Sequence, residues 1–310
     1  MIVVLSVQEL RDIAEVIHNQ LHQCRSLNVA VSVAILSDPK LTVQWQSNEI
    51  VLSIQIGDSI SISPIPEWLR CEFHTEHLKL FFPEHRLTEI EYLLRKSVEA
   101  FLESGAVDPN RIVLAALRIA LQTWTGAGEP MPSREQLGLL GELSMLVELS
   151  TRIAPIDLVN GWDETSRAPL DFNLDDGRML EAKVTSPNST KVEATSLYQF
   201  VADNYPIILG VTQITPDATG TTLPDLVSKL LQRLDEIEKS GVASRLLKNK
   251  VRSRFPLIER REYFRSKWKI HGFSSKIVDA NSTAATFPST VPTDVTIQGF
   301  SFDFKDYAAY

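Results

Sequence analysis

Two acids and a lysine lie close together around one short turn of the sequence. The stretch PLDFNLDDGRMLEAK, residues 169–183, contains Asp171 before the turn and Glu181 and Lys183 after it. Residues i and i+2 of a strand point to the same face, so Glu181 and Lys183 are expected to point together. Carboxylates and an ammonium group at this spacing could hold a divalent cation and act on a phosphodiester.

The length of the turn decides whether Asp171 joins the other two side chains. A two-residue loop at Asp176 and Gly177 would set Asp171 opposite Ala182, on the wrong face. A three-residue loop sets Asp171 opposite Glu181 instead. The sequence Asp-Asp-Gly suits this longer loop, because its third residue is left-handed and favours glycine. We therefore expect Asp171 and Glu181 to converge on one face of a hairpin.

Two carboxylates beside a single ammonium group would repel each other if nothing else balanced their charge. A divalent cation removes that repulsion. Mg²⁺ takes oxygen ligands, keeps several waters and is usually held by one or two carboxylates together with phosphate oxygens of a substrate. The turn is therefore interpreted as a place that holds Mg²⁺, or Mn²⁺ in its stead, beside a phosphodiester.

These residues resemble a known family. Asp171 followed by Glu181-Ala182-Lys183 is similar to the D…(D/E)-x-K core of the PD-(D/E)XK nuclease superfamily, which includes restriction endonucleases and DNA-repair nucleases. The segments LGELSML, GWDETSRAPLDF and SLYQF resemble a bacterial group of PD-(D/E)XK motif proteins that is associated with restriction and phage-defence loci. The resemblance covers about residues 133–213. One departure is Leu170, which stands where the signature has proline, with Pro169 one place earlier.

The resemblance implies a role for each matching residue. Asp171 and Glu181 would be metal ligands, and Lys183 would be the water-activating base or an electrostatic stabiliser. Glu142 matches an acid that the superfamily often supplies from its first helix, as a further metal ligand; the alternative is an ordinary acid on a helix surface. Gln199 matches a polar position near the catalytic lysine, although a simple hydrogen-bonding amide explains it better.

The elements that must position these residues fall into two parts. Strand-like segments rich in Val and Ile come first, followed by helical apolar spacing over residues 87–104 and 110–124. The Gly- and Pro-rich stretch TGAGEPMPS then marks a boundary. We expect an N-terminal β-rich domain with closing helices at residues 1–125, acting in target or partner recognition, and a nuclease-like domain at residues 126–310.

The second part alternates helices and strands. A helix is expected over about residues 134–151, with Ser133 and Gln136 forming a capping box at its start. The apolar run PIILGVTQI predicts a buried strand, and TDVTIQGFSFDFKDY predicts a late antiparallel strand. The expected fold class is α/β (α+β), with a restriction-endonuclease-like core of a helix, a mixed central sheet and further helices.

Positive charge is concentrated in one segment. Residues 245–269 contain ten Lys or Arg and two Glu, a charge of +8 in a chain of net charge −8, which leaves −16 elsewhere. Such a segment could neutralise phosphates, so nucleic-acid contacts are expected at Arg252, Arg254, Arg260 and Arg261. The aromatic residues among these charges, namely Phe255, Tyr263, Phe264 and Trp268, are expected to turn into the core.

Composition and missing motifs narrow the classes of protein. The start MIVVLSVQELRDIAEVIHNQ is interrupted by polar and charged residues and lacks a basic leader, so neither a signal peptide nor a membrane span is expected, and the cytoplasm is the predicted compartment. Only Cys24 and Cys71 are present, which fits a reducing compartment. The sequence has neither a Walker loop nor a G-x-S-x-G elbow, which argues against a self-contained ATPase or a serine hydrolase of that fold.

The leading interpretation is a Mg²⁺-dependent DNA endonuclease that serves as the effector of a restriction or phage-defence system. The alternative is a non-catalytic, nuclease-like DNA-binding or scaffold subunit of a multiprotein defence complex. The presence of Asp171, Glu181 and Lys183 together favours the enzyme, because a scaffold does not need all three. Expected partners are DNA, a second copy of the chain, and a methyltransferase or ATPase from a defence locus.

Overall fold

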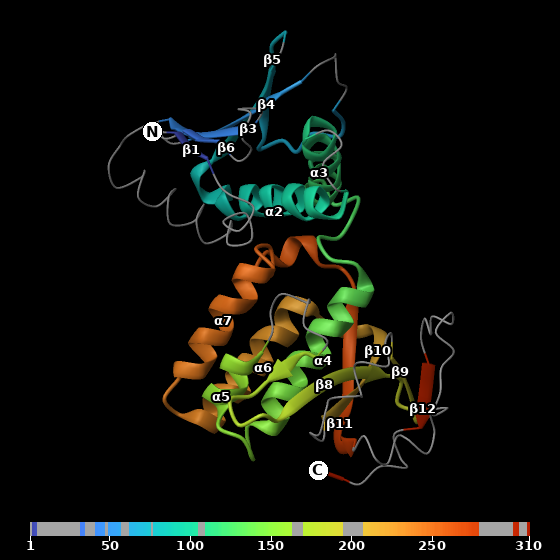
Figure 1. Ribbon diagram of the computed structural model, residues 1–310. Coiled ribbons are helices and arrows are strands. Elements are labelled where there is room, and N and C mark those ends of the chain that lie inside the picture. The colour runs from blue at the N-terminus through green and yellow to red at the C-terminus, as the bar shows by residue number, and fades with distance from the viewer. Residues whose placement is uncertain are drawn as a thin grey trace, which may run out of the picture. The chain divides into compact units, whose positions relative to one another are not determined.

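The computed structural model describes residues 2–4, 32–34, 41–46, 49–56, 62–75, 77–104, 109–162, 170–194, 207–278, 300–303 and 309–310. The chain forms two compact units (Figure 1). The first comprises Met1–Pro130 with Phe255–Glu259, and the second comprises Met131–Arg254 with Arg260–Tyr310. The boundary expected between residues 125 and 126 lies close to this division. The recognition role assigned to the first part stays a prediction.

The first unit contains a six-stranded sheet in the order β1-β2-β3-β4-β6-β5. Its strands are β1 (Ile2–Val4), β2 (Ser32–Ala34), β3 (Leu41–Gln46), β4 (Glu49–Gln55), β5 (Arg70–Phe73) and β6 (His77–Pro83). The first two strands pair in parallel, and the other pairs are antiparallel. Helices α2 (Leu87–Ser104) and α3 (Pro109–Trp124) pack against each other and against β6 and β4, respectively. Both helices lie where the apolar spacing predicts them.

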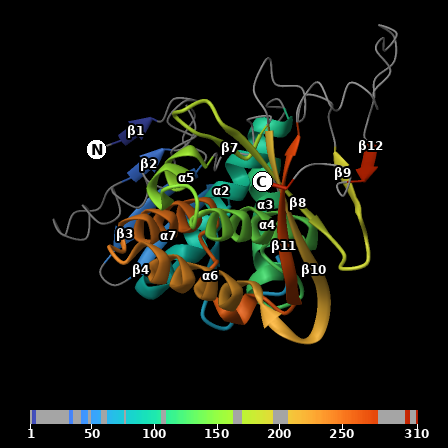
Figure 2. The same cartoon turned by 90° about the horizontal axis from the view of Figure 1, so that it is seen from below.

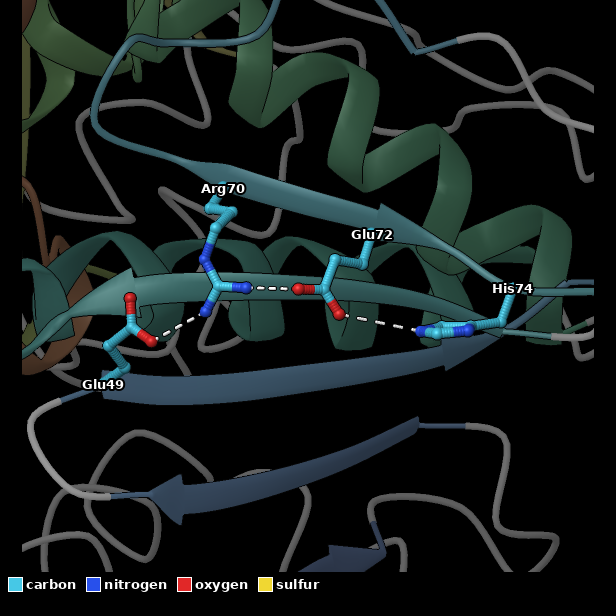
Figure 3. A network of polar contacts seen from close by, with 4 residues as sticks. All are labelled: Glu49, Arg70, Glu72 and His74. Atoms are coloured by element: carbon cyan, nitrogen blue, oxygen red, sulfur yellow. Dashed lines mark hydrogen bonds and ion pairs between the residues drawn. The ribbon is translucent and has the colours of Figure 1, made fainter.

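The edge strand β5 carries a chain of charged side chains (Figure 3). Arg70 donates to Glu72 on the same strand and, at 2.8 Å, to Glu49 Oε2 at the start of β4. His74 Nε2 lies 3.7 Å from Glu72 Oε2. About half of the Arg70 side chain is exposed, so these pairs add little stability. Charge on an edge strand does, however, oppose pairing with another chain.

The second unit is built on a four-stranded mixed sheet in the order β11-β10-β8-β7. Its strands are β7 (Phe172–Asn173), β8 (Met179–Thr185), β10 (Ile207–Thr222) and β11 (Lys267–Val278), and a separate pair is formed by β9 (Lys191–Ala194) and β12 (Phe300–Asp303). Strands β8 and β10 run parallel, whereas β7 and β11 are antiparallel to their neighbours. The helices are α4 (Ser133–Leu149), α5 (Pro155–Gly161), α6 (Leu223–Glu238) and α7 (Val242–Arg254).

Helix α4 packs closely on the sheet, against β8, β10 and β11 (Figure 2). Two glycines permit this approach. A Cβ atom at Gly141 would lie 2.7 Å from Val184 Cγ2, and one at Gly210 would lie 2.6 Å from Met145 Sδ. Both distances are shorter than a normal packing contact, so a side chain at either position would force Val184 or Met145 to move. This close packing brings Glu142, the residue after Gly141, next to the strands that carry the candidate site.

The predicted capping box at the start of α4 is wrong. The helix begins at Ser133, but its N-cap residue Pro132 makes no side-chain cap bond. Gln136 is fully buried; its amide nitrogen donates to Met131 O at 3.0 Å, and its Oε1 accepts from Trp268 Nε1 at 3.0 Å. The Gln136 side chain therefore satisfies buried polar groups of the core instead of capping the helix.

The architecture is a mixed α+β fold, consistent with the expected restriction-endonuclease-like core. Ile207–Ile214 of the apolar run PIILGVTQI lie in β10, between β8 and β11, as a buried strand should. The late antiparallel strand is confirmed for Phe300–Asp303, which form β12 and pair with β9, whereas the rest of TDVTIQGFSFDFKDY lies outside the described residues. Among the described residues, none of the helices is both long and apolar enough to cross a membrane.

Candidate active site

The turn between β7 and β8 has the predicted length. Leu174 N donates to Arg178 O at 2.9 Å, which leaves a loop of three residues between them. Gly177, at the third place, has a φ of 84°, the left-handed conformation that favours glycine. Asp176 accepts hydrogen bonds from Arg178 N at 3.0 Å and from Arg178 Nε at 2.8 Å, which hold the loop closed. The three-residue loop is confirmed.

This loop fixes the position of Asp171. Phe172 pairs with Leu180, so the register sets Asp171 opposite Glu181, as expected. Asp171 Oδ2 accepts a hydrogen bond from Ala182 N at 2.7 Å, which orients the carboxylate across the end of β7. Burial raises the pKa of Asp171, although this bond and the charge of Lys183 act in the opposite direction.

Glu181 is buried, with 2% of its surface exposed. Its Oε1 lies 2.5 Å from Lys183 Nζ, so the two side chains do point together. Its Oε2 is buried without a hydrogen-bond partner. Burial, and next the Asp171 carboxylate, raise the pKa of Glu181 to about 8. In the absence of a cation the site therefore favours a proton on Glu181 at neutral pH.

The structure adds Glu142 to this neighbourhood. Glu142 Oε2 accepts a hydrogen bond from Trp162 Nε1 at 2.8 Å and another from Arg254 Nη1 at 3.1 Å. Burial raises the pKa of Glu142 to about 7, and the nearby Asp171 carboxylate raises it too, whereas Arg254 and the Trp162 indole lower it. Glu142 is therefore a buried, partnered acid and not a solvated residue on the helix surface.

Arg254 was expected on an exposed nucleic-acid-binding face, and the structure places it in the candidate site instead. Only 15% of its side chain is exposed, and its charge lowers the pKa values of Glu142 and Asp171. Lys250, one turn earlier on α7, donates to Trp162 O at 3.3 Å. The i, i+4 spacing of Lys250 and Arg254 shows from the sequence alone that they share one face of the helix. Basic residues lie on opposite sides of this helix, so the sequence does not show which face packs against another element.

The remaining predicted residues are dispersed. Arg252 and Arg261 are exposed and Arg260 is partly buried, with Arg261 Nη2 2.9 Å from Asp225 Oδ1. Their assignment to nucleic acid stays a prediction. Tyr263, Phe264 and Trp268 are each 4% exposed, which confirms that these three aromatic residues turn into the core, whereas Phe255 is only partly buried. Gln199 lies outside the described residues.

The carboxylates of Asp171 and Glu181 suit a cation that needs few protein ligands. Within the described residues, no group of three or more His, Cys, Asp or Glu side chains is arranged to hold a metal ion, so the ligand role of Glu142 stays a prediction. Asp171 and Glu181 nevertheless converge, and the unpartnered Glu181 Oε2 is a buried oxygen that a cation would satisfy. Two carboxylates are the usual protein contribution to a Mg²⁺ site.

Comparisons with known proteins identify the family of the chain. No curated protein and no solved structure matches the chain. A family model described as "Putative PD-(D/E)XK family member, (DUF4420)" matches residues 94–295, which is more than half of the chain. The matched range includes Glu142, Asp171, Glu181, Lys183 and Arg254. The chain therefore belongs to this PD-(D/E)XK family.

Proposed function

We propose that this protein is a Mg²⁺-dependent DNA endonuclease. The observation that carries the proposal is the convergence of Asp171, Glu181 and Lys183 at one hairpin, with a buried Glu181 oxygen that lacks a partner. Membership of a PD-(D/E)XK family supports a nuclease-like fold around these residues. An isolated buried carboxylate oxygen destabilises the folded chain, so its presence in the site favours a function that uses it.

Each side chain of the hairpin has a distinct part in this proposal. Asp171 and Glu181 would hold the Mg²⁺, which when bound supplies Lewis-acid polarisation of a phosphoryl oxygen. The Ala182 N–H bond keeps the Asp171 carboxylate in a fixed orientation. Lys183, held by Glu181 Oε1, presents its Nζ atom either as an ammonium that stabilises phosphate charge or as an amine that accepts a proton from the attacking water.

The proposed biological role rests on the resemblance of several sequence segments to other proteins. The segments around the site resemble bacterial proteins of restriction and phage-defence loci, which supports a role as the effector of such a system. In that role the chain would act on DNA together with a methyltransferase or an ATPase, since its own sequence has no Walker loop.

A plasmid cleavage assay tests the proposal. Purified wild-type protein is incubated with plasmid in Mg²⁺ or in EDTA, beside Lys183→Ala. Lys191→Ala is the matched control, because Lys191 is an exposed lysine on the neighbouring strand β9. We expect cleavage only in Mg²⁺ and only by the wild type and Lys191→Ala. No cutting by the wild type would favour the non-catalytic scaffold, and equal cutting by Lys183→Ala would show that the cleavage does not depend on the proposed site.

A further inference from the structure

Trp162 connects several elements of the second unit at one point. It follows α5 directly, and its backbone forms an antiparallel bridge with Phe172, the residue after Asp171. Its indole N–H donates to Glu142 Oε2 on α4, and its carbonyl oxygen accepts from Lys250 on α7. Only 2% of Trp162 is exposed. A buried residue that is held both by its backbone and by its side chain has little freedom to move.

Arg254 approaches the same carboxylate from another direction. It is the last residue of α7; its Nη1 is 3.1 Å from Glu142 Oε2, and its guanidinium carbon is 5.8 Å from the centre of the Trp162 ring. One oxygen of Glu142 therefore accepts from both an indole and a guanidinium group. Hydrogen bonds to ionised groups are stronger and more directional than those between neutral groups, so two donors fix the orientation of this carboxylate.

We infer that Trp162 and Arg254 form a clamp that positions Glu142 beside Asp171, so that Glu142 supports the proposed reaction as a third acid. This inference rests on the proposed function for its kinetic readout. Trp162 and Arg254 are positioning residues, because the indole and the guanidinium group both donate hydrogen bonds to the Glu142 carboxylate. Residues that orient the groups around a reactive centre usually matter for activity almost as much as the groups themselves.

Two other pairs on α4 provide matched controls. Trp268 Nε1 donates to Gln136 Oε1 at 3.0 Å, and Arg233 Nη1 lies 2.6 Å from Glu148 Oε1. The first is a buried indole bond from β11 to α4 and the second is an Arg–Glu pair between α6 and α4, but neither contains a residue of the candidate site. A loss caused only by weaker packing of α4 should appear in these controls too.

A double-mutant cycle on plasmid cleavage tests the kinetic part. Trp162→Phe and Arg254→Gln are each measured alone and in combination with Glu142→Gln. We expect each single change to lower kcat about 10–100-fold with an unchanged KM for DNA. Each double variant should cut no more slowly than Glu142→Gln alone, because the clamp acts through Glu142. Trp268→Phe and Arg233→Gln should keep the wild-type kcat. Losses that multiply in the double variants would overturn the inference.

A second measurement does not depend on activity. The chain has five tryptophans, so the indole N–H signals are few enough to resolve by NMR, and Trp162→Phe identifies the Trp162 signal. We expect this signal to move in Glu142→Gln and in Arg254→Gln but not in Arg233→Gln. If the wild type fails to cut DNA while the signal moves, the proposed function is wrong and the clamp stands. A signal that stays in place in Arg254→Gln overturns the clamp.

Discussion

Among single residues, Glu181 shows most clearly the conflict between stability and the proposed chemistry. Its pKa is raised from 4.5 to about 8, first by burial and next by the Asp171 carboxylate. The folded chain therefore keeps a proton that the unfolded chain releases between these values. That contribution to stability is fully present below pH 4.5 and is lost as the pH rises through about 8.

The first prediction concerns this pH dependence. In EDTA, the Tm of the wild type should fall between about pH 5 and pH 8 more steeply than the Tm of Glu181→Gln, because glutamine has no proton to release. The difference at the alkaline end corresponds to a free energy of unfolding on the order of a few kcal/mol. Thermal melts followed by circular dichroism measure it. Parallel curves for the two proteins would show that Glu181 does not titrate in this range.

The second prediction concerns a divalent cation at the same residue. Mg²⁺ bound to ionised Glu181 and Asp171 replaces the proton, so adding it at about pH 8 should raise the Tm of the wild type. Glu181→Gln and Asp171→Asn should show a much smaller rise, since each removes one anionic ligand. Calorimetric titration with Mn²⁺ provides an independent measurement. Equal stabilisation of all three proteins would place the cation elsewhere.

At the scale of helices and strands, the features that could be predicted from the sequence are those set by residues close together in the chain. The three-residue loop and the convergence of Asp171 with Glu181 follow from turn chemistry and strand alternation, which need no knowledge of the rest of the fold. The bond between Gln136 and Trp268 and the place of Arg254 could not be predicted in this way. Both depend on which face of a helix meets another element, and that contact comes from residues more than 100 positions away in the sequence.

The third prediction tests the register of the hairpin. Deleting Asn173 keeps the Asp175-Asp176-Gly177 loop but moves Asp171 one place along β7, opposite Leu180 instead of Glu181. Asp171 should then point to the other face of the hairpin, so cleavage should be lost while the secondary structure is kept. Deleting Asp175 is the control, because Leu174 and Arg178 can close the remaining two-residue Asp-Gly turn and keep Asp171 opposite Glu181. Equal cleavage by the two deletion variants would contradict the role of the register.

At the scale of the whole molecule, charge is distributed unevenly. The chain has a net charge of −8, yet α7 exposes Arg245, Lys248 and Arg252 at positions i, i+3 and i+7, which lie on one face of a helix. Arg254 belongs to the candidate site, so it is no longer expected to contribute to this face. A basic face on an acidic protein concentrates attraction for a polyanion in one place and leaves the remaining surface repulsive.

The fourth prediction is that this face contacts DNA phosphates. Replacing Arg245, Lys248 and Arg252 together by glutamine should weaken DNA binding and flatten its dependence on salt, by about 0.9 in the logarithmic slope for each lost phosphate contact. Fluorescence anisotropy in EDTA, where no cleavage occurs, measures the slope. Arg233→Gln, an exposed arginine on α6, should leave it unchanged. A triple variant with the wild-type slope would assign these residues to an ordinary solvated face.

The fifth prediction concerns the number of chains that cut a duplex. Glu181-Ala182-Lys183 is the only Glu-x-Lys triplet in the sequence, so each chain offers one such site for two antiparallel strands. Two copies related by a two-fold axis would address both scissile phosphates equivalently, and such dimers are the commonest closed assemblies. Mixing wild type with an excess of Lys183→Ala should therefore convert double-strand breaks into nicks, because most pairs would then contain one inactive site.

Light scattering with and without DNA should show the paired species. A monomer that linearises plasmid in a single binding event, undisturbed by excess Lys183→Ala, would instead require one site to cut both strands in turn.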